Sequence, residues 1–217
     1  MDDVIVFVGA RGGQGTSTIA ATAALQAAQH APTSLLCLDP LATAALLGSS
    51  PVLPGDHAEI APRLTLAGLD GPRGAVTVID AGMLATAPPP PVGSRTVLVL
   101  RGPSYLALHT AVGHPDLHAD GAVVVAESGR ALSDLDVREI LAVPVLATVP
   151  FRAEIARTVD AGLLLTEATS LPGLRPVHSL VDGLLPDRAL RRQLDVRSPA
   201  LHRAAHDAPL LDAEVGW

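Results

Sequence analysis

A glycine-rich segment near the N-terminus holds the residue types that bind phosphate. It follows the apolar run 4–9 and reads Arg11-Gly12-Gly13-Gln14-Gly15-Thr16-Ser17-Thr18. Glycines in such a loop let backbone N–H groups converge on an anion, and the helix that follows points its positive end at the same place. Residues 11–18 are therefore predicted to form a nucleotide-binding loop that joins a buried strand to a helix.

Position 16 removes the main point charge from this loop. The common phosphate-loop pattern G-x-x-x-x-G-K-[ST] has Lys where this chain has Thr16, and all fifteen basic residues of the sequence are Arg. The Lys neutralises the outer phosphates of ATP, and its loss costs about 1.5–3 kcal/mol, or roughly one to two decades in affinity. We expect weak ATP binding and absent or very slow hydrolysis. A tight turn that binds nothing is the alternative.

Three more polar residues could complete a site for ATP and Mg²⁺. Ser17 stands where a loop hydroxyl binds Mg²⁺. Asp80 ends the apolar run 76–80, and a charge at the carboxyl end of a buried strand lies where α/β folds bind ligands. We assign Ser17 and Asp80 to Mg²⁺, Asp80 through water. Asp39 follows the run 34–38 in the same way, and either Asp could instead stabilise a turn.

Apolar runs alternate with helical patterns along most of the chain, which predicts an α/β fold. The runs show little alternation, as expected for a mostly parallel, doubly wound central sheet covered on both faces. Strands are expected at 4–9, 34–38, 63–67, 76–80, 96–100, 122–126 and 145–149, and helices at 16–30, 41–47, 104–112, 133–141 and 153–164. Loops are expected at 48–56 and 88–91. One domain should span residues 1–186, followed by a C-terminal helix and an acidic tail in residues 187–217.

The composition of the chain indicates which binding partners and which cell compartment to expect. The net charge of −7 and pI of about 5.5 argue against nucleic-acid binding. The single cysteine, Cys37, lies in an apolar run and is expected to be a small buried residue rather than a reactive thiol. A single Cys, no signal-peptide pattern and no apolar run near ~20 residues together favour the cytoplasm.

The ordered motifs resemble those of the ParA/MinD group of deviant P-loop ATPases. That group's loop, x-K-G-G-x-G-K-[ST]-[ST], aligns without gaps with residues 11–18. Its signature Lys, which reaches a dimer partner's phosphates, matches Arg11, and its P-loop Lys matches Thr16. Its D-x-D-P motif resembles Cys37-Leu38-Asp39-Pro40 with the first Asp replaced, its Walker B strand resembles 76–80, and its later v-x-x-v-P-y/f element resembles 145–151. The resemblance implies a P-loop NTPase-like three-layer α/β/α fold over roughly residues 3–165. It also implies that Asp39 would orient the attacking water if the site is active.

Within that group, R-G-G-x-G-x-S-T with a small residue in place of Lys is most similar to the actinobacterial CpaE/TadZ-like branch. That branch is associated with Tad-type pilus assembly and secretion, and a relative is linked to septum-site control. The resemblance implies a cytoplasmic spatial-positioning or scaffold protein that forms a homodimer, binds a secretion, pilus or division protein, and is recruited to a pole or septum. The alternative is an active ATPase in which Arg11 supplies the missing charge.

Other charged residues favour plainer interpretations. His114 and His118, and likewise His202 and His206, could in principle hold a metal, but neither pair has a third ligand nearby, so solvated histidines are expected. The Arg-rich stretch 188–203 lacks bulky apolar anchors. It is therefore expected to be a solvated helix or a docking surface, with membrane contact at most peripheral.

Overall fold

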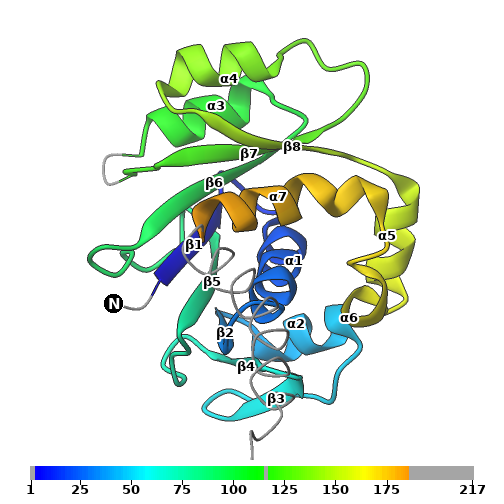
Figure 1. Ribbon diagram of the computed structural model, residues 1–217. Helices are drawn as coiled ribbons and strands as arrows, with labels where there is room; N and C mark the ends of the chain where they lie inside the picture. The colour runs from blue at the N-terminus through cyan, green and yellow to red at the C-terminus, as the bar shows by residue number, and fades with distance from the viewer. Residues whose placement is uncertain (1–2, 115–116, 186–217) are drawn as a thin grey trace, which may run out of the picture.

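The computed structural model describes residues 3–114 and 117–185, and the chain there forms a mostly parallel eight-stranded sheet with helices on both faces (Figure 1). The strand order is β3-β4-β2-β5-β1-β6-β7-β8, and only the β3–β4 pair is antiparallel. The strands are β1 (Asp3–Gly9), β2 (Thr33–Cys37), β3 (His57–Ala61), β4 (Leu64–Gly68), β5 (Val76–Met83), β6 (Arg95–Arg101), β7 (Gly121–Ala126) and β8 (Val145–Pro150). The predicted three-layer, doubly wound α/β fold is confirmed.

Helices divide between the two faces of the sheet. They are α1 (Thr16–Ala28), α2 (Pro40–Leu47), α3 (Tyr105–Val112), α4 (Asp134–Leu141), α5 (Ala153–Asp160), α6 (Leu164–Glu167) and α7 (Arg175–Leu184), with a 3₁₀ turn at Pro172–Leu174. One core joins α1, α2, α5 and α7 to the face that carries Ile5 and Phe7, and the other joins α3 and α4 to the face of Val6 and Val8. Alternate residues of β1 thus enter opposite cores, as period-two strand geometry requires.

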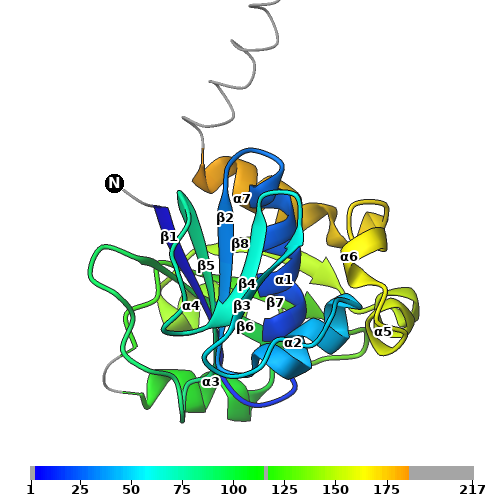
Figure 2. The same cartoon turned by 90° about the horizontal axis from the view of Figure 1, so that it is seen from below.

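The central position of β1 determines where a ligand can bind. β1 lies between β5 and β6, both parallel to it, so its carboxyl end opens at the point where the chain turns from one half of the sheet to the other. Open parallel sheets bind ligands at that switch point. The glycine-rich loop leaves β1 there and enters α1, the helix that lies across the middle of the sheet (Figure 2).

Three elements differ from the sequence-based expectation. β3 was not predicted, because His57–Ala61 has a charged residue and little apolar character and is an edge strand paired only with β4. The predicted helix 153–164 is broken into α5 and α6 by Gly162, whose φ of 64° ends α5. α7 was also missed, although its buried Val177, Leu180 and Val181 form one apolar face. The loops at 48–56 and 88–91 are confirmed.

Candidate nucleotide site

Backbone conformation shapes the loop for a close approach of an anion. Gly13 and Gly15 have φ of 75° and 84°, which side chains with a Cβ rarely adopt. Gly15 is the N-cap of α1, and its carbonyl accepts the first helical hydrogen bond from Ile19 N–H at 3.0 Å. Ala10 N–H donates to Val99 O at 3.2 Å and ties the start of the loop to β6. The loop is therefore the strand-to-helix turn that the sequence predicted, with the N-terminus of α1 directed into it.

Thr16 packs into the protein instead of reaching toward a ligand. Its side chain is buried, and its Oγ1 would lie 2.5 Å from a Cβ placed on Gly9. The side chain therefore folds back on the end of β1, which a glycine at position 9 permits. Thr16 brings no charge to the loop, so the phosphate cup keeps its amides and helix N-terminus but has no cation on its first helical turn.

Ser17 and Asp80 meet below the loop. Asp80 is only 5% exposed, and β5 places it in register with Phe7 of β1 and Cys37 of β2. Its carboxylate accepts a hydrogen bond from Gly82 N–H at 3.0 Å, and the nearby Ser17 hydroxyl also lowers its pKa. Burial nevertheless raises the pKa of Asp80 overall, because these polar neighbours replace only part of the lost hydration. A buried carboxylate beside a loop hydroxyl is a donor set that suits Mg²⁺ carrying several waters.

Asp39 serves first as a helix cap. Its Oδ1 accepts from Ala42 N–H at 2.9 Å and its carbonyl accepts from Thr43 Oγ1 at 2.9 Å, so it begins α2. Asp39 is exposed at the same edge of the sheet as Asp80. Cys37, two residues earlier, is buried with its pKa raised to about 11, chiefly by desolvation. The structure brings Asp39 to the site and gives it a structural role there.

Arg11 lies on the outside of the loop. The side chain is exposed and forms no ion pair with any residue in the described ranges 3–114 and 117–185. Gly12 and Gly13 beside it are also exposed, whereas Gln14, Gly15, Ser17 and Thr18 are half-buried. Arg11 is thus accessible to a second molecule.

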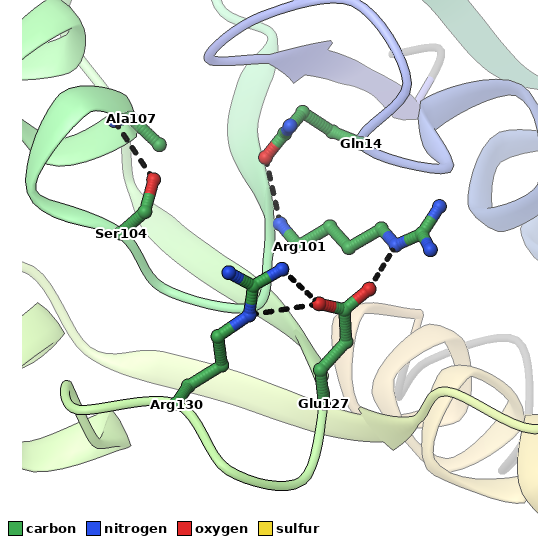
Figure 3. Close-up of polar contacts among 6 residues, drawn as sticks. All are labelled: Gln14, Arg101, Ser104, Ala107, Glu127 and Arg130. Atoms are coloured by element: carbon green, nitrogen blue, oxygen red, sulfur yellow. Dashed lines mark hydrogen bonds and ion pairs between the residues drawn. The ribbon is translucent and has the colours of Figure 1, made fainter.

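A charged cluster that sequence analysis missed lies beside the loop (Figure 3). Gln14 Oε1 accepts from Arg101 N–H at 2.7 Å, and Arg101 Nε donates to Glu127 Oε1 at 2.6 Å. Arg130 also donates to Glu127, and the Arg101 guanidinium lies 3.9 Å from the centre of the Phe151 ring. The signal was available, because Arg101 is a charge at the carboxyl end of a buried strand, the same feature that singled out Asp80.

These residues border a cavity of about 270 Å³ that opens next to the loop. Its polar walls include Gln14, Thr18 and Arg101, and its apolar walls come from the ends of β7 and β8 and from α5. Loop, cation and apolar wall are the features that a nucleotide requires for its phosphates and its base.

Exposed apolar side chains lie at the edge of the sheet where the loop leaves β1. They follow or end parallel strands whose carboxyl ends meet there, and they are Leu38, Leu41, Met83, Tyr105, Leu106 and Phe151. An ideal Cβ on Gly12 would lie 3.9 Å from the sulfur of Met83, so at least this member of the set lies against the loop. We call these six residues the apolar rim.

The predictions for the histidines and the C-terminal region can be compared with the structure only in part. His118 is exposed as expected, and His114 is half-buried, with an inaccessible Nδ1 that has no hydrogen-bond partner among residues 3–114 and 117–185. Within the described residues, no three His, Cys, Asp or Glu side chains gather as metal ligands. Nor is any helix in those ranges long and apolar enough to cross a membrane. His202, His206, the Arg-rich stretch 188–203 and the predicted segment 187–217 lie outside the described residues.

Comparison with solved structures shows which known proteins share this fold. MinD from Aquifex aeolicus superposes with a TM-score of 0.65 at 14% identity, over 85% of this chain and 97% of that one. The septum site-determining protein MinD with Mg-ADP from Pyrococcus horikoshii gives 0.69 at 14% identity, over 85% and 96%. A substituted McdA from Cyanothece in complex with ATP gives 0.63 at 14% identity, over 85% and 96%. The sequence itself matches no protein-family model and no curated protein. The chain therefore has the α/β fold of the MinD and ParA P-loop ATPases.

Proposed function

We propose that this chain is a ParA/MinD-like spatial-positioning or scaffold protein that binds ATP and Mg²⁺ weakly and hydrolyses ATP very slowly or not at all. The observation that carries the proposal is the contrast between Ser17 and Thr16 on the same turn of α1. Ser17 keeps a hydroxyl beside buried Asp80, whereas Thr16 is neutral and folded back on Gly9. The magnesium side of the site is kept while the charge for the outer phosphates is missing.

The proposed assembly is a homodimer through the loop face. The apolar rim and exposed Arg11 supply both apolar area and a cation at one edge of the sheet. Solved neighbours with this fold include a MinC:MinD cell division protein complex, which supports a protein partner from division, pilus or secretion machinery. The acidic net charge of −7 supports a function without nucleic acid. We place the protein in the cytoplasm, recruited to a pole or septum by its partner, within the CpaE/TadZ-like branch.

A second candidate is an active ATPase in which Arg11 of one protomer serves the loop of the other. The Arg11 side chain favours it, because it is exposed, has no ion-pair partner among the described residues and carries a guanidinium, which can bind phosphate oxygens with paired donors. Asp39 would then orient the attacking water. In this case hydrolysis would depend on protein concentration, since each site needs a partner.

Phosphate release and nucleotide affinity test the proposal together. Purified protein with Mg²⁺ and ATP should bind ATP in a calorimetric titration and release phosphate far more slowly than ~1 s⁻¹, the low end of ordinary enzyme turnover. Turnover at or above that rate would reject the scaffold proposal in favour of the active ATPase. The same titration with ADP, and with EDTA in place of Mg²⁺, establishes whether the Ser17–Asp80 pair contributes. Absence of any binding would reject the nucleotide part of the proposal.

A further inference from the structure

Arg101 is a cation that a neighbouring strand of the same chain fixes beside the phosphate loop. It ends β6, which pairs with β1 up to Gly9↔Val99, so its backbone lies level with the start of the loop. The 2.7 Å hydrogen bond from Arg101 N–H to Gln14 joins the two segments directly. Both residues also border the cavity beside Gly13 and Gly15. Arg101 therefore approaches the loop from a rigid strand end.

The guanidinium of Arg101 has donors to spare. Its bond to Glu127 uses Nε, and neither terminal nitrogen donates to any residue in the described part of the chain. In Figure 3 those two nitrogens point away from Glu127. The flat face of the group packs on Phe151, an arrangement that holds the plane while leaving its edge open. Paired terminal N–H donors on a fixed plane are the geometry that binds phosphate oxygens.

Charge balance allows Arg101 to leave Glu127. One carboxylate, Glu127, is shared by two guanidinium groups, those of Arg101 and Arg130, so the cluster carries a net positive charge. If Arg101 turned toward an anion at the loop, Arg130 would keep Glu127 paired and no buried carboxylate would be left without a partner. The usual penalty for breaking an ion pair would then be small.

We infer that Arg101 of β6 supplies, within the same chain, the cation that Thr16 does not provide, by binding the phosphates of a nucleoside di- or triphosphate held in the loop. Glu127 and Arg130 then control how readily the Arg101 side chain leaves its ion pair with Glu127. This inference rests on the proposed nucleotide binding. It differs from the Arg11 alternative, because Arg101 acts within its own chain and needs no dimer. Glu127 competes with the ligand for Arg101, whereas Arg130 competes with Arg101 for Glu127.

Three substitutions should change ATP affinity in a pattern of signs that a merely structural role would not give. Arg101→Gln should weaken ATP binding about tenfold or more, the effect of losing a charge-assisted contact. Glu127→Gln should tighten binding, because it releases Arg101. Arg130→Gln should weaken binding, because Glu127 then holds Arg101 alone. Arg101→Lys keeps the charge and should recover part of the loss. Arg138→Gln, an exposed arginine on α4, is the matched control for removing one positive charge.

Calorimetry with ATP, tripolyphosphate and adenosine, at protein concentrations where the chain is monomeric, provides the readout. Arg101→Gln should weaken ATP and tripolyphosphate and leave adenosine unchanged. An equal loss for adenosine, or unchanged ATP affinity in a folded Arg101→Gln protein, would overturn the inference and leave nucleotide binding standing. If the unmodified protein bound none of the three probes, the proposed nucleotide binding and this inference would both fall. Circular dichroism and thermal melting establish that each variant is folded, and the Glu127→Gln and Arg101→Lys variants test the inference should Arg101→Gln not fold.

Discussion

Ser17 and Asp80, which are 63 positions apart in sequence, are neighbours beneath the phosphate loop, where the Ser17 hydroxyl lowers the pKa of the Asp80 carboxylate. The contact exists because β5 and β1 are adjacent and parallel, so the end of one strand lies against the first turn of the helix that follows the other. Ser17 and Gly82 lower the pKa of Asp80 less than burial raises it. The result is a carboxylate that is costly to ionise until a cation arrives.

Asp80→Asn should therefore stabilise the protein in the absence of Mg²⁺. Because the pKa of Asp80 is raised in the folded state, the stability that its protonated form contributes is complete below the unfolded value of 3.8 and is lost as pH rises through the raised folded value. At pH values above the folded pKa of Asp80, the Asn variant keeps the stability that the wild type loses, because its side chain does not ionise. We expect a Tm about 2–4 °C higher at neutral pH, which is the shift that ~1 kcal/mol produces in a chain of this size.

The same variant should lose the Mg²⁺ dependence of ATP binding. Thermal melting from pH 3 to 8 without Mg²⁺, and calorimetry with and without Mg²⁺, measure the two effects separately. The difference in Tm between Asn and wild type should shrink toward zero below pH 3.8. Asp80→Ala is the control, because it also removes the acceptor for Gly82 N–H and should destabilise the turn. A lower Tm for Asp80→Asn at neutral pH would contradict the argument.

Thr16→Lys separates the scaffold from the active ATPase. If the missing charge limits binding, Lys at position 16 should tighten ATP about ten- to a hundredfold, the gain of one charge-assisted contact. If Arg11 already supplies the charge, Thr16→Lys should matter little and Arg11→Ala should abolish phosphate release. Gly9 bears on the comparison, because its missing Cβ leaves the space that Thr16 Oγ1 now uses. Titration and phosphate release measured on both variants therefore assign the role of Arg11.

The architecture of the loop could be predicted because it depends on local sequence. The run 4–9, the glycines and the periodicity after Thr16 lie within one segment, and the apolar strands of a buried parallel sheet need no partner to be recognised. The role of Asp39 could not be predicted in this way. Its place in the sequence fits either a turn cap or a residue that orients water, and the structure shows the cap.

What could not be predicted depends on strand register and on packing between distant segments. Arg101 and Glu127 pair because β6 and β7 align Arg101 with Val125, a register that neither strand's own sequence specifies. β3 has no apolar run of its own and forms because β4 offers it an unpaired edge. In both cases the deciding partner is remote in sequence.

Cys37 should be unreactive in the folded protein. The thiol is buried and its pKa is raised to about 11, mainly by desolvation, so almost none of it is thiolate at neutral pH. Labelling with a chromogenic disulfide reagent at pH 7.5 should be slow and should become fast in denaturing urea. The single Cys makes the signal unambiguous. Fast labelling of the native protein would show that this part of β2 opens readily.

The contact between Gly48 and Gly162 connects α2 to the junction of α5 and α6, helices that lie side by side in Figures 1 and 2. A Cβ on Gly48 would lie 1.8 Å from Gly162 O, and Gly48 also has a φ of 74°. Gly48→Ala must therefore move backbone against backbone as well as adopt a left-handed conformation. We expect a loss of at least ~2 kcal/mol in the free energy of unfolding, because the left-handed conformation alone costs roughly 1–2 kcal/mol.

Gly55 provides the matched control for this substitution. Its φ is 86°, but nothing lies within 4 Å of the position of its Cβ. Gly55→Ala therefore incurs the conformational penalty without the collision, and urea unfolding of both variants isolates the packing contribution as their difference. Since Asp39 begins α2 and Gly48 ends it, Gly48→Ala should also disturb the Asp39 cap and lower any nucleotide affinity that depends on this edge. Equal destabilisation of the two variants would mean that the α2–α5 junction yields freely and that the close approach contributes nothing.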